Sequence, residues 1–228
     1  MIKGDLRKKQ ILETAEELFT MKGYEATGVQ DILDRLQLSK GSFYHHFESK
    51  ELVLQTICET RAEKAAAGLR DEPFTDGLAR MNQLLTGMIP FSGEGLSFLK
   101  MILPVFVLPE GKSVRGGYQE ALKREWLPMT EKALDLMISR KQAYTLYPQA
   151  TAGIVLDLVN DLWAQISQQM ILAEKSTREP MNPGTLLALV EPYRASVENL
   201  LSAPYGSFTL LNLEDLTKVT EEIHDWWL

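Results

Sequence analysis

Residues 39–50 hold side chains suited to contact with another molecule. The stretch Ser39-Lys40-Gly41-Ser42-Phe43-Tyr44-His45-His46 combines hydroxyl groups, ring nitrogens and a cation, and it contains no carboxylate. Such groups can bind base edges and phosphates, whereas a carboxylate would be repelled by phosphate. Gly41 would allow a nucleic-acid backbone to approach closely, and Lys50 would add a cation at a helix N-terminus, where phosphates bind. These residue types therefore predict a nucleic-acid contact surface.

Short helices with recognisable ends must position these side chains. Apolar residues at helical spacing predict a first helix over residues 5–22, and Gly23 ends it. Thr27 is expected to open a second helix, with Gln30 completing a capping box. Ser39 is a capping candidate for a short third helix, and residues 48–69 predict a fourth. Three short helices with a tight turn between the last two match the helix-turn-helix plan, in which the last helix enters the major groove.

The order of residues in this region resembles a known family. The string comprises Ile11-Leu12, Ala15, Leu18-Phe19, Gly23-Tyr24, Thr27, Ile32, Ser39-Lys40-Gly41, Phe43-Tyr44, His46-Phe47 and Lys50-Glu51-Leu52. It is similar to the TetR family of bacterial one-component regulators. The resemblance implies an all-helical homodimer and a transcriptional repressor. It also implies a variable C-terminal domain that binds a small molecule and, in most members, then weakens DNA binding.

The resemblance also supplies the candidate contacts with an operator in double-stranded DNA. They are Thr27, Gln30, Lys40, Gly41, Ser42, Tyr44, His45, His46 and Lys50. Two readings stay open for several of them, since Thr27 could be only a cap and Lys40 and Lys50 could be ordinary surface lysines. The family usually has a small residue and a glycine in the turn before the third helix. Here the turn is Leu36-Gln37-Leu38, so Gln37 must adopt the positive φ of the turn, which is strained for a residue other than glycine.

The remainder of the chain also predicts helices, and therefore an all-α fold. We expect them near residues 75–89, 95–107, 113–140, 147–175, 184–202 and 213–227. The breaker-rich stretch 71–77 marks a domain boundary. The predicted organisation is an N-terminal three-helix helix-turn-helix domain (1–50), a connecting helix (51–70), and a larger helical ligand-binding and dimerisation domain (71–228).

A pocket for an apolar or amphiphilic effector is expected among the Met and aromatic residues of the C-terminal domain. The candidate lining residues are Met88, Phe98, Met101, Trp126, Asp157, Asn160, Asp161 and Trp163. The aromatic and Met residues could instead be plain core, and the three polar ones could lie between subunits or face water. If the two acids do line the pocket, a cationic amphiphile would suit it.

Two predicted helices, 147–175 and 184–202, have more apolar residues than one buried stripe requires. Two such helices from each subunit could form a four-helix bundle, which would be the dimer interface. A dimer would hold its two recognition helices about 34–36 Å apart, the spacing of successive major grooves.

Composition excludes several other classes. The net charge of −7 looks unfavourable for DNA binding, but residues 1–64 hold 10 Lys and Arg against 11 Asp and Glu, so the acidity lies mainly in the rest. No apolar run is long enough for a membrane span, and no secretory signal is evident, so we expect a cytoplasmic protein. Cys58, the single cysteine, is expected to be a buried apolar residue, with a redox switch as the alternative.

No catalytic constellation is evident in the sequence. There is no nucleophile–base pair at a recognisable spacing, no phosphate-binding glycine loop and no cluster of metal ligands, so we expect no catalytic residues, cofactor or metal. Adjacent histidines point to different faces of a helix, which disfavours metal binding by His45 and His46. The competing hypotheses are an all-α enzyme and a helical adaptor without DNA binding.

Overall fold

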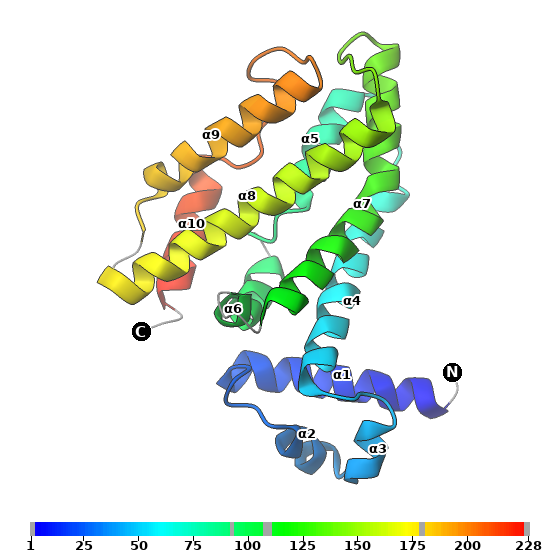
Figure 1. Cartoon of the computed structure of the whole chain (residues 1–228), viewed down its shortest axis with the longest axis vertical. Helices are drawn as coiled ribbons and strands as arrows, with labels where there is room; N and C mark the ends of the chain where they lie inside the picture. Colours follow the sequence, from blue (N-terminus) through cyan, green and yellow to red (C-terminus); the bar gives the residue numbers. More distant parts are fainter. Residues whose placement is uncertain (1–2, 92–93, 107–110, 178–180, 226–228) are drawn as a thin grey trace.

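The computed structural model describes residues 3–91, 94–106, 111–177 and 181–225, and within these ranges it is helical without strands. Figure 1 shows a small unit at one end, joined to a larger helical body by one long helix. The helices are α1 (Lys3–Lys22), α2 (Val29–Leu36), α3 (Lys40–Tyr44), α4 (Lys50–Arg70), α5 (Gly77–Gly87), α6 (Glu94–Phe106), α7 (Lys112–Ser139), α8 (Pro148–Thr177), α9 (Pro183–Leu200) and α10 (Leu213–Asp225). This arrangement confirms the all-α prediction.

The small unit consists of α1, α2, α3 and the first turns of α4. Ile11, Ala15 and Phe19 form the buried stripe of α1, and they belong to the same core as Phe43 and Phe47. The apolar spacing along α1 thus decides which face of this helix covers the other two. Burial of apolar surface is the main term that stabilises such a small unit, so packing of this stripe fixes the orientation of α1.

α4 leads from the small unit into the larger body, where α7 is the central helix. α7 packs against α4, α5 and α8, and α8 packs in turn against α9. Trp126 of α7 is fully buried, and its indole N–H donates to the carbonyl oxygen of Leu84 over 2.9 Å. α6 lies between the two units, because it contacts α1 as well as α7 and α8. A change in the body can therefore reach the small unit through α4 and α6.

The capping prediction for α2 is wrong. Gly28 is the N-cap, and the Asp31 carboxylate accepts from the Gly28 N–H over 2.6 Å, so the capping box lies one residue further along than expected. The Thr27 side chain is fully buried, and its hydroxyl donates to the carbonyl oxygens of Gly23 and Leu18. Thr27 thus joins the end of α1 to the start of α2 instead of capping a helix.

Other predicted ends are confirmed. Ser39 caps α3, with its hydroxyl accepting from the Ser42 N–H over 3.2 Å, and Gln37 has φ 53° at the end of α2. Gly23 ends α1 with φ 85°. The start of α4 differs slightly from the prediction, because Ser49 is its N-cap and accepts from the Leu52 N–H. In the described part of the chain, no helix has the length and hydropathy required to cross a membrane.

Candidate nucleic-acid interface and internal pocket

α3 presents one polar face to the outside because its apolar face is anchored. Phe43 and Phe47 are buried in the small unit. Lys40, Gly41 and His45 are exposed, and Tyr44 is 53% exposed. Nothing lies within 4 Å of the position that a Gly41 Cβ atom would take, so packing within the protein does not require glycine there.

Lys50 joins the start of α4 to the segment between α1 and α2. Its ammonium group donates to the carbonyl oxygen of Tyr24 over 2.9 Å and lies 4.0 Å from the centroid of the Tyr24 ring. An ammonium has three N–H donors, so this contact leaves others available to an external acceptor. Burial, together with the negative charge of Glu51, raises the pKa of Tyr24 above its ordinary value, so the ring facing Lys50 stays neutral.

The two histidines differ in exposure. Their ring centroids lie 5.0 Å apart, with the rings edge to face. His45 is exposed, whereas His46 is half-buried, and its Cε1 lies 4.0 Å from where a Cβ atom on Gly4 of α1 would stand. Among the described residues, no group of three or more His, Cys, Asp or Glu side chains could hold a metal ion.

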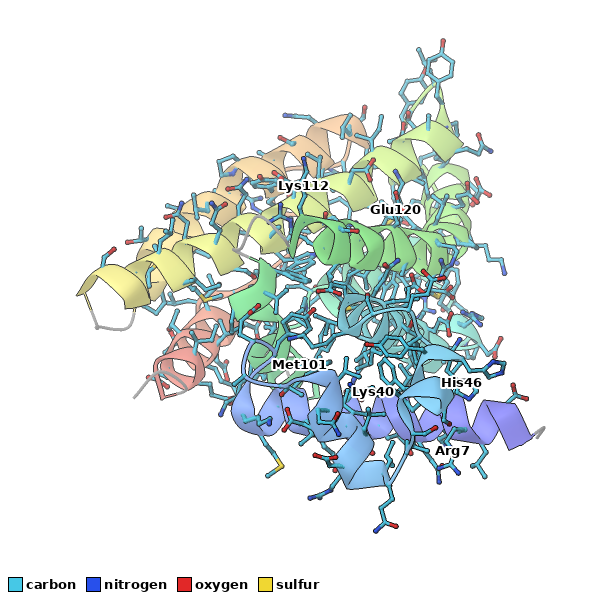
Figure 2. The ribbon with its side chains drawn as sticks, turned by 60° about the horizontal axis from the view of Figure 1, so that its bottom comes forward. Arg7, Lys40, His46, Met101, Lys112 and Glu120 are labelled. Carbon is cyan, nitrogen blue, oxygen red and sulfur yellow. The ribbon has the colours of Figure 1, made fainter. Side chains whose placement is uncertain are left out.

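Figure 2 turns the small unit forward and shows Arg7, Lys40 and His46 at this end of the molecule. Lys8, beside them on α1, has its ammonium 5.6 Å from the centroid of the Phe47 ring. On the α2 side, two cations are paired with acids. Lys22 Nζ lies 2.7 Å from Asp31 Oδ1, and Arg35 Nη2 lies 3.9 Å from Glu17 Oε2.

The remaining predicted contacts lie at different depths. Gln30 is exposed and donates to the Asp34 carboxylate over 2.7 Å, and Ser42 is half-buried behind the cap of α3. Thr27 has no side-chain surface, so we do not include it in the interface proposed below. The structure thus places Gln30 on α2 and the other candidates on α3, directly after it, or at the start of α4.

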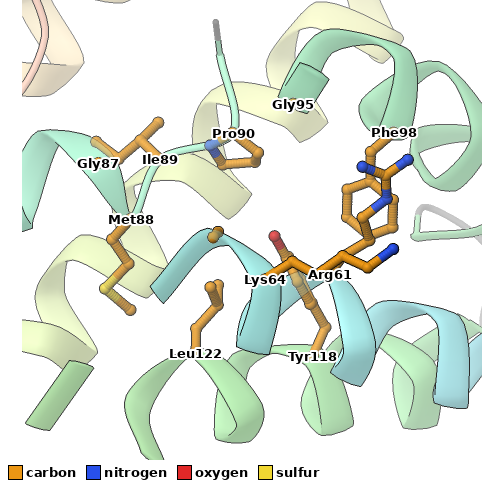
Figure 3. A pocket seen from close by; sticks show the side chains of 11 residues that line it. Arg61, Lys64, Gly87, Met88, Ile89, Pro90, Gly95, Phe98, Tyr118 and Leu122 are labelled. Atoms are coloured by element: carbon orange, nitrogen blue, oxygen red, sulfur yellow. The ribbon is translucent and has the colours of Figure 1, made fainter. Parts of the chain in front are cut away.

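A cavity of about 270 Å³ lies in the larger body, where α4 and α7 meet the end of α5 and the start of α6. Figure 3 shows its walls, with the Tyr118 hydroxyl pointing into the space. The lining residues are Arg61, Lys64, Ala65, Gly87, Met88, Ile89, Pro90, Gly95, Phe98, Tyr118 and Leu122. Two of the predicted ligand residues, Met88 and Phe98, are among them.

The three polar ligand candidates lie elsewhere. Asp157, Asn160 and Asp161 border a separate, open groove between α7 and α8. Asp157 forms an ion pair with Lys123 over 2.6 Å, and Asp161 accepts from the Tyr193 hydroxyl. The argument for a cationic effector therefore has no support from this cavity.

Three further candidates are packed in the core. Asn160 accepts from the indole N–H of Trp163 over 3.2 Å, which explains a polar residue in an otherwise apolar stretch. Trp163, Trp126 and Met101 are all buried, and none of them lines the cavity of α4 and α7. These three side chains are therefore part of the packed core, which is the alternative to pocket lining that the sequence also allows.

Sequence reasoning missed the polar part of the cavity. Arg61 and Lys64 are three positions apart on α4, which places both on one face of the helix. Ala65 follows on the same face, so a small residue leaves room beside two cations. This combination was a usable signal, although only the crossing of α4 over α7 shows that the face borders a cavity.

Arg61 also contacts the small unit. Its Nε and Nη2 atoms donate to Glu16 Oε1 of α1 over 2.9 and 2.6 Å. The two side chains are 26% and 27% exposed, so the pair is partly shielded from water. A wall residue of the cavity is thus tied directly to the unit that presents α3.

The chain is similar to known proteins in sequence. Residues 11–57 match the family described as bacterial regulatory proteins, tetR family. The HTH-type transcriptional regulator UidR of Escherichia coli is 28% identical over 174 residues, which cover 74% of this chain and 86% of UidR.

Solved structures agree in fold. A TetR-family transcriptional regulator from Pectobacterium atrosepticum superposes with a TM-score of 0.56 at 19% identity, covering 88% of this chain and 97% of the other. A putative transcriptional regulator from Saccharomonospora viridis, solved in complex with choline, gives a TM-score of 0.52 at 18% identity, covering 86% and 98%. Residues 11–57 thus match the tetR family of bacterial regulatory proteins, and these findings support a helix-turn-helix transcriptional regulator of that kind.

Proposed function

We propose that the protein is a homodimeric repressor that binds an operator through α3 and the start of α4 and is released by a small molecule. As a DNA-binding regulator it acts in the cytoplasm, where bacterial DNA lies. In this proposal residues 1–50 bind DNA, residues 51–70 connect the DNA-binding unit to the larger body, and residues 71–228 bind the effector and the second subunit.

The outward face of α3 is the observation that supports this proposal best. The buried Phe43 and Phe47 hold the helix so that Lys40, Gly41, Tyr44 and His45 face outward together. The contacts we assign to phosphate are Lys40, Tyr44 and Lys50, and those we assign to bases or close backbone approach are Gln30, Gly41, Ser42, His45 and His46.

The cavity between α4 and α7 is the proposed effector site. Its walls are mainly apolar, with two cations and one hydroxyl, which is the usual composition of a small-molecule pocket. The choline complex of the Saccharomonospora viridis protein shows that a chain of this fold accommodates a small molecule. The effector of the present protein would act by changing the position of α4, from which the small unit extends.

We assign dimerisation to α8 and α9, with one change from the sequence argument. Most of the apolar residues that suggested an interface, including Val155, Leu156 and Val159, are buried within one protomer. Ile154 is 47% exposed, and Leu158, Leu187, Leu189 and Leu200 are half-buried, so these are the ones available to a second copy. Light scattering on the wild type and on Ile154→Asp tests this assignment, with the variant expected to be monomeric.

Selection of a duplex from a random pool, followed by fluorescence anisotropy, tests DNA binding. The expected result is binding to a selected duplex that weakens steeply as salt rises, because Lys40 and Lys50 displace counterions from phosphate. A helical adaptor would leave every duplex unbound at low salt. Repression itself is tested by placing the selected sequence upstream of a reporter gene, whose expression should fall when the protein is present.

A further inference from the structure

Arg61 belongs to two sites at once. Its side chain forms part of the cavity wall, and its Nε and Nη2 atoms donate to Oε1 of Glu16, which lies on α1. Figure 3 shows the guanidinium beside Phe98 at the edge of the cavity. A ligand that draws the guanidinium toward the cavity therefore acts on a contact of the small unit.

The cavity favours a particular kind of ligand. Met88, Phe98 and Leu122 are buried apolar wall residues, so the body of the ligand is apolar. Arg61 and Lys64 provide positive charge, and the described lining residues include no carboxylate, since Glu16, the acid that pairs with Arg61, lies on α1 outside this lining. A cationic head group would be repelled here, and a neutral one would gain only hydrogen bonds.

We propose that the effector is an anionic amphiphile, such as a carboxylate on an apolar body, and that its anionic group displaces Glu16 from Arg61. This inference rests on the proposed effector site and specifies its ligand class and its coupling to DNA binding. The displacement removes one polar contact between α4 and α1, so that the position of α3 relative to the larger body is no longer fixed by this ion pair.

The chemistry of the guanidinium explains why the exchange is selective. Arginine keeps its charge at any pH that the fold withstands, and its paired N–H groups match a carboxylate. Glu16 occupies the Nε–Nη2 edge through one oxygen. A second carboxylate that takes this edge replaces Glu16 without leaving the guanidinium unpaired, and the unpaired charge after the exchange is the Glu16 carboxylate, whose side chain is 27% exposed to water.

Coupling of this kind must be reciprocal. If the ligand weakens the Glu16–Arg61 pair, then removing the pair must strengthen ligand binding by the same factor. A change in ligand affinity on removal of the pair therefore distinguishes the proposed exchange from a pocket in which Arg61 only attracts the ligand by its charge. A simple cation in the wall would bind the ligand equally well with or without Glu16.

The first experiment tests the charge of the ligand with matched probes. Isothermal titration calorimetry on the full chain compares octanoate, octanamide and octylamine, and then 4-phenylbutyrate with its amide and amine. The carboxylates are expected to bind about tenfold or more tightly than the amides, in the range of a single charged contact, and the amines least. Equal binding of carboxylate and amide, or no carboxylate binding at millimolar concentration, would overturn the proposal.

The second experiment tests the exchange. Glu16→Gln is expected to bind octanoate about tenfold more tightly than the wild type and to bind DNA more weakly, with little further response to octanoate. Glu13→Gln is the matched control, because Glu13 lies on the same helix and pairs only loosely with Lys9 over 3.6 Å. An unchanged octanoate affinity in Glu16→Gln shows that no exchange takes place.

Variants of the cavity complete the test. Arg61→Gln and Lys64→Gln should each reduce the preference for octanoate over octanamide, Arg61→Gln more strongly. Lys132→Gln on α7, an exposed lysine outside the cavity, should leave the preference unchanged. If Arg61→Gln does not fold, as judged by thermal melting, the Lys64→Gln and Glu16→Gln results still decide the matter.

The outcomes distinguish this inference from the proposed function. If no duplex binds the wild type, the proposed repressor fails, yet calorimetry still shows whether Glu16→Gln tightens octanoate binding. If DNA binds and an uncharged ligand releases it, the repressor stands and the anionic effector is excluded.

Discussion

The ammonium group of Lys50 lies on the face of the Tyr24 ring, 4.0 Å from its centroid, and donates to the Tyr24 carbonyl oxygen over 2.9 Å. This contact ties the first residue of α4 to the segment that precedes α2. We expect Lys50→Ala to lower the free energy of unfolding by about 1–2 kcal/mol, because a cation–π contact and a charged hydrogen bond are lost together. Chemical denaturation measures this change.

The same variant should also weaken binding to all DNA sequences alike. Loss of one phosphate contact reduces the slope of log affinity against log salt by about 1. Lys40→Ala is the matched control for stability, because Lys40 is exposed at the start of α3, and it should lose DNA affinity with unchanged stability. A stability loss in Lys50→Ala without any loss of DNA affinity would assign Lys50 a structural role alone.

Gly41 offers a change that separates folding from DNA binding. No atom lies within 4 Å of the Cβ position, so Gly41→Ala should fold normally and gain up to about 1 kcal/mol from its better helix propensity. The added methyl group would face the DNA backbone, and we expect a loss of affinity of at least tenfold in fluorescence anisotropy.

Gly68→Ala is the control for this substitution. Gly68 is also helical and exposed, with no atom within 4 Å of its Cβ position, but it lies near the end of α4, far along the helix from α3. It should gain similar stability and leave DNA affinity unchanged. Equal DNA affinities of the two variants would show that no close approach occurs at Gly41.

Helix positions were largely predictable because their signals are local. Ser39 accepts from an N–H group three residues ahead, and Asn212 does the same at the start of α10. The start of α2 was predicted wrongly because two capping boxes overlap there, Thr27 with Gln30 and Gly28 with Asp31. Burial of Thr27 between α1 and α2 decides between them, and burial is a tertiary effect that a local pattern does not contain.

The cavity was much less predictable than the helices. Met88 and Phe98 have the same character as Trp126 and Met101, yet only the first pair faces the cavity. The difference depends on how α4, α6 and α7 cross, and a sequence pattern specifies only which face of a helix is apolar. The link between Arg61 and Glu16 spans two units for the same reason, and no spacing rule could reveal it.

The turn at Gln37 predicts a substitution that raises the free energy of unfolding. Its φ of 53° lies in the left-handed region, and the following Leu38 N–H donates to the Leu33 carbonyl oxygen to close the turn. Because a side chain is strained in this region, Gln37→Gly should raise the free energy of unfolding by about 0.5–1 kcal/mol. Gln30→Gly, within α2, should instead lower it by a similar amount. A loss of stability in Gln37→Gly would mean that the side chain stabilises the turn.

Cys58 is fully buried in α4, and this burial, with the nearby charges of Glu59 and Glu16, raises the pKa of its thiol above the ordinary range. The thiol therefore stays neutral in the folded protein, and iodoacetamide should label it only after denaturation. Rapid labelling of the native protein, followed by mass spectrometry, would instead support the redox switch considered from the sequence.

The raised pKa also sets a direction for stability against pH. Above about pH 8.5 the unfolded chain can ionise this thiol while the folded protein keeps it neutral, so the free energy of unfolding should decrease as pH rises from there. The contribution is fully present below that pH. Cys58→Ala should be less stable at neutral pH because of the cavity it leaves, yet lose less stability between about pH 8.5 and 10. The tyrosines with raised pKa, Tyr24, Tyr118 and Tyr193, contribute only from about pH 10, where unfolded tyrosine ionises, and they are the same in both proteins. Parallel curves for the two proteins in this interval would therefore show that Cys58 is not the responsible group.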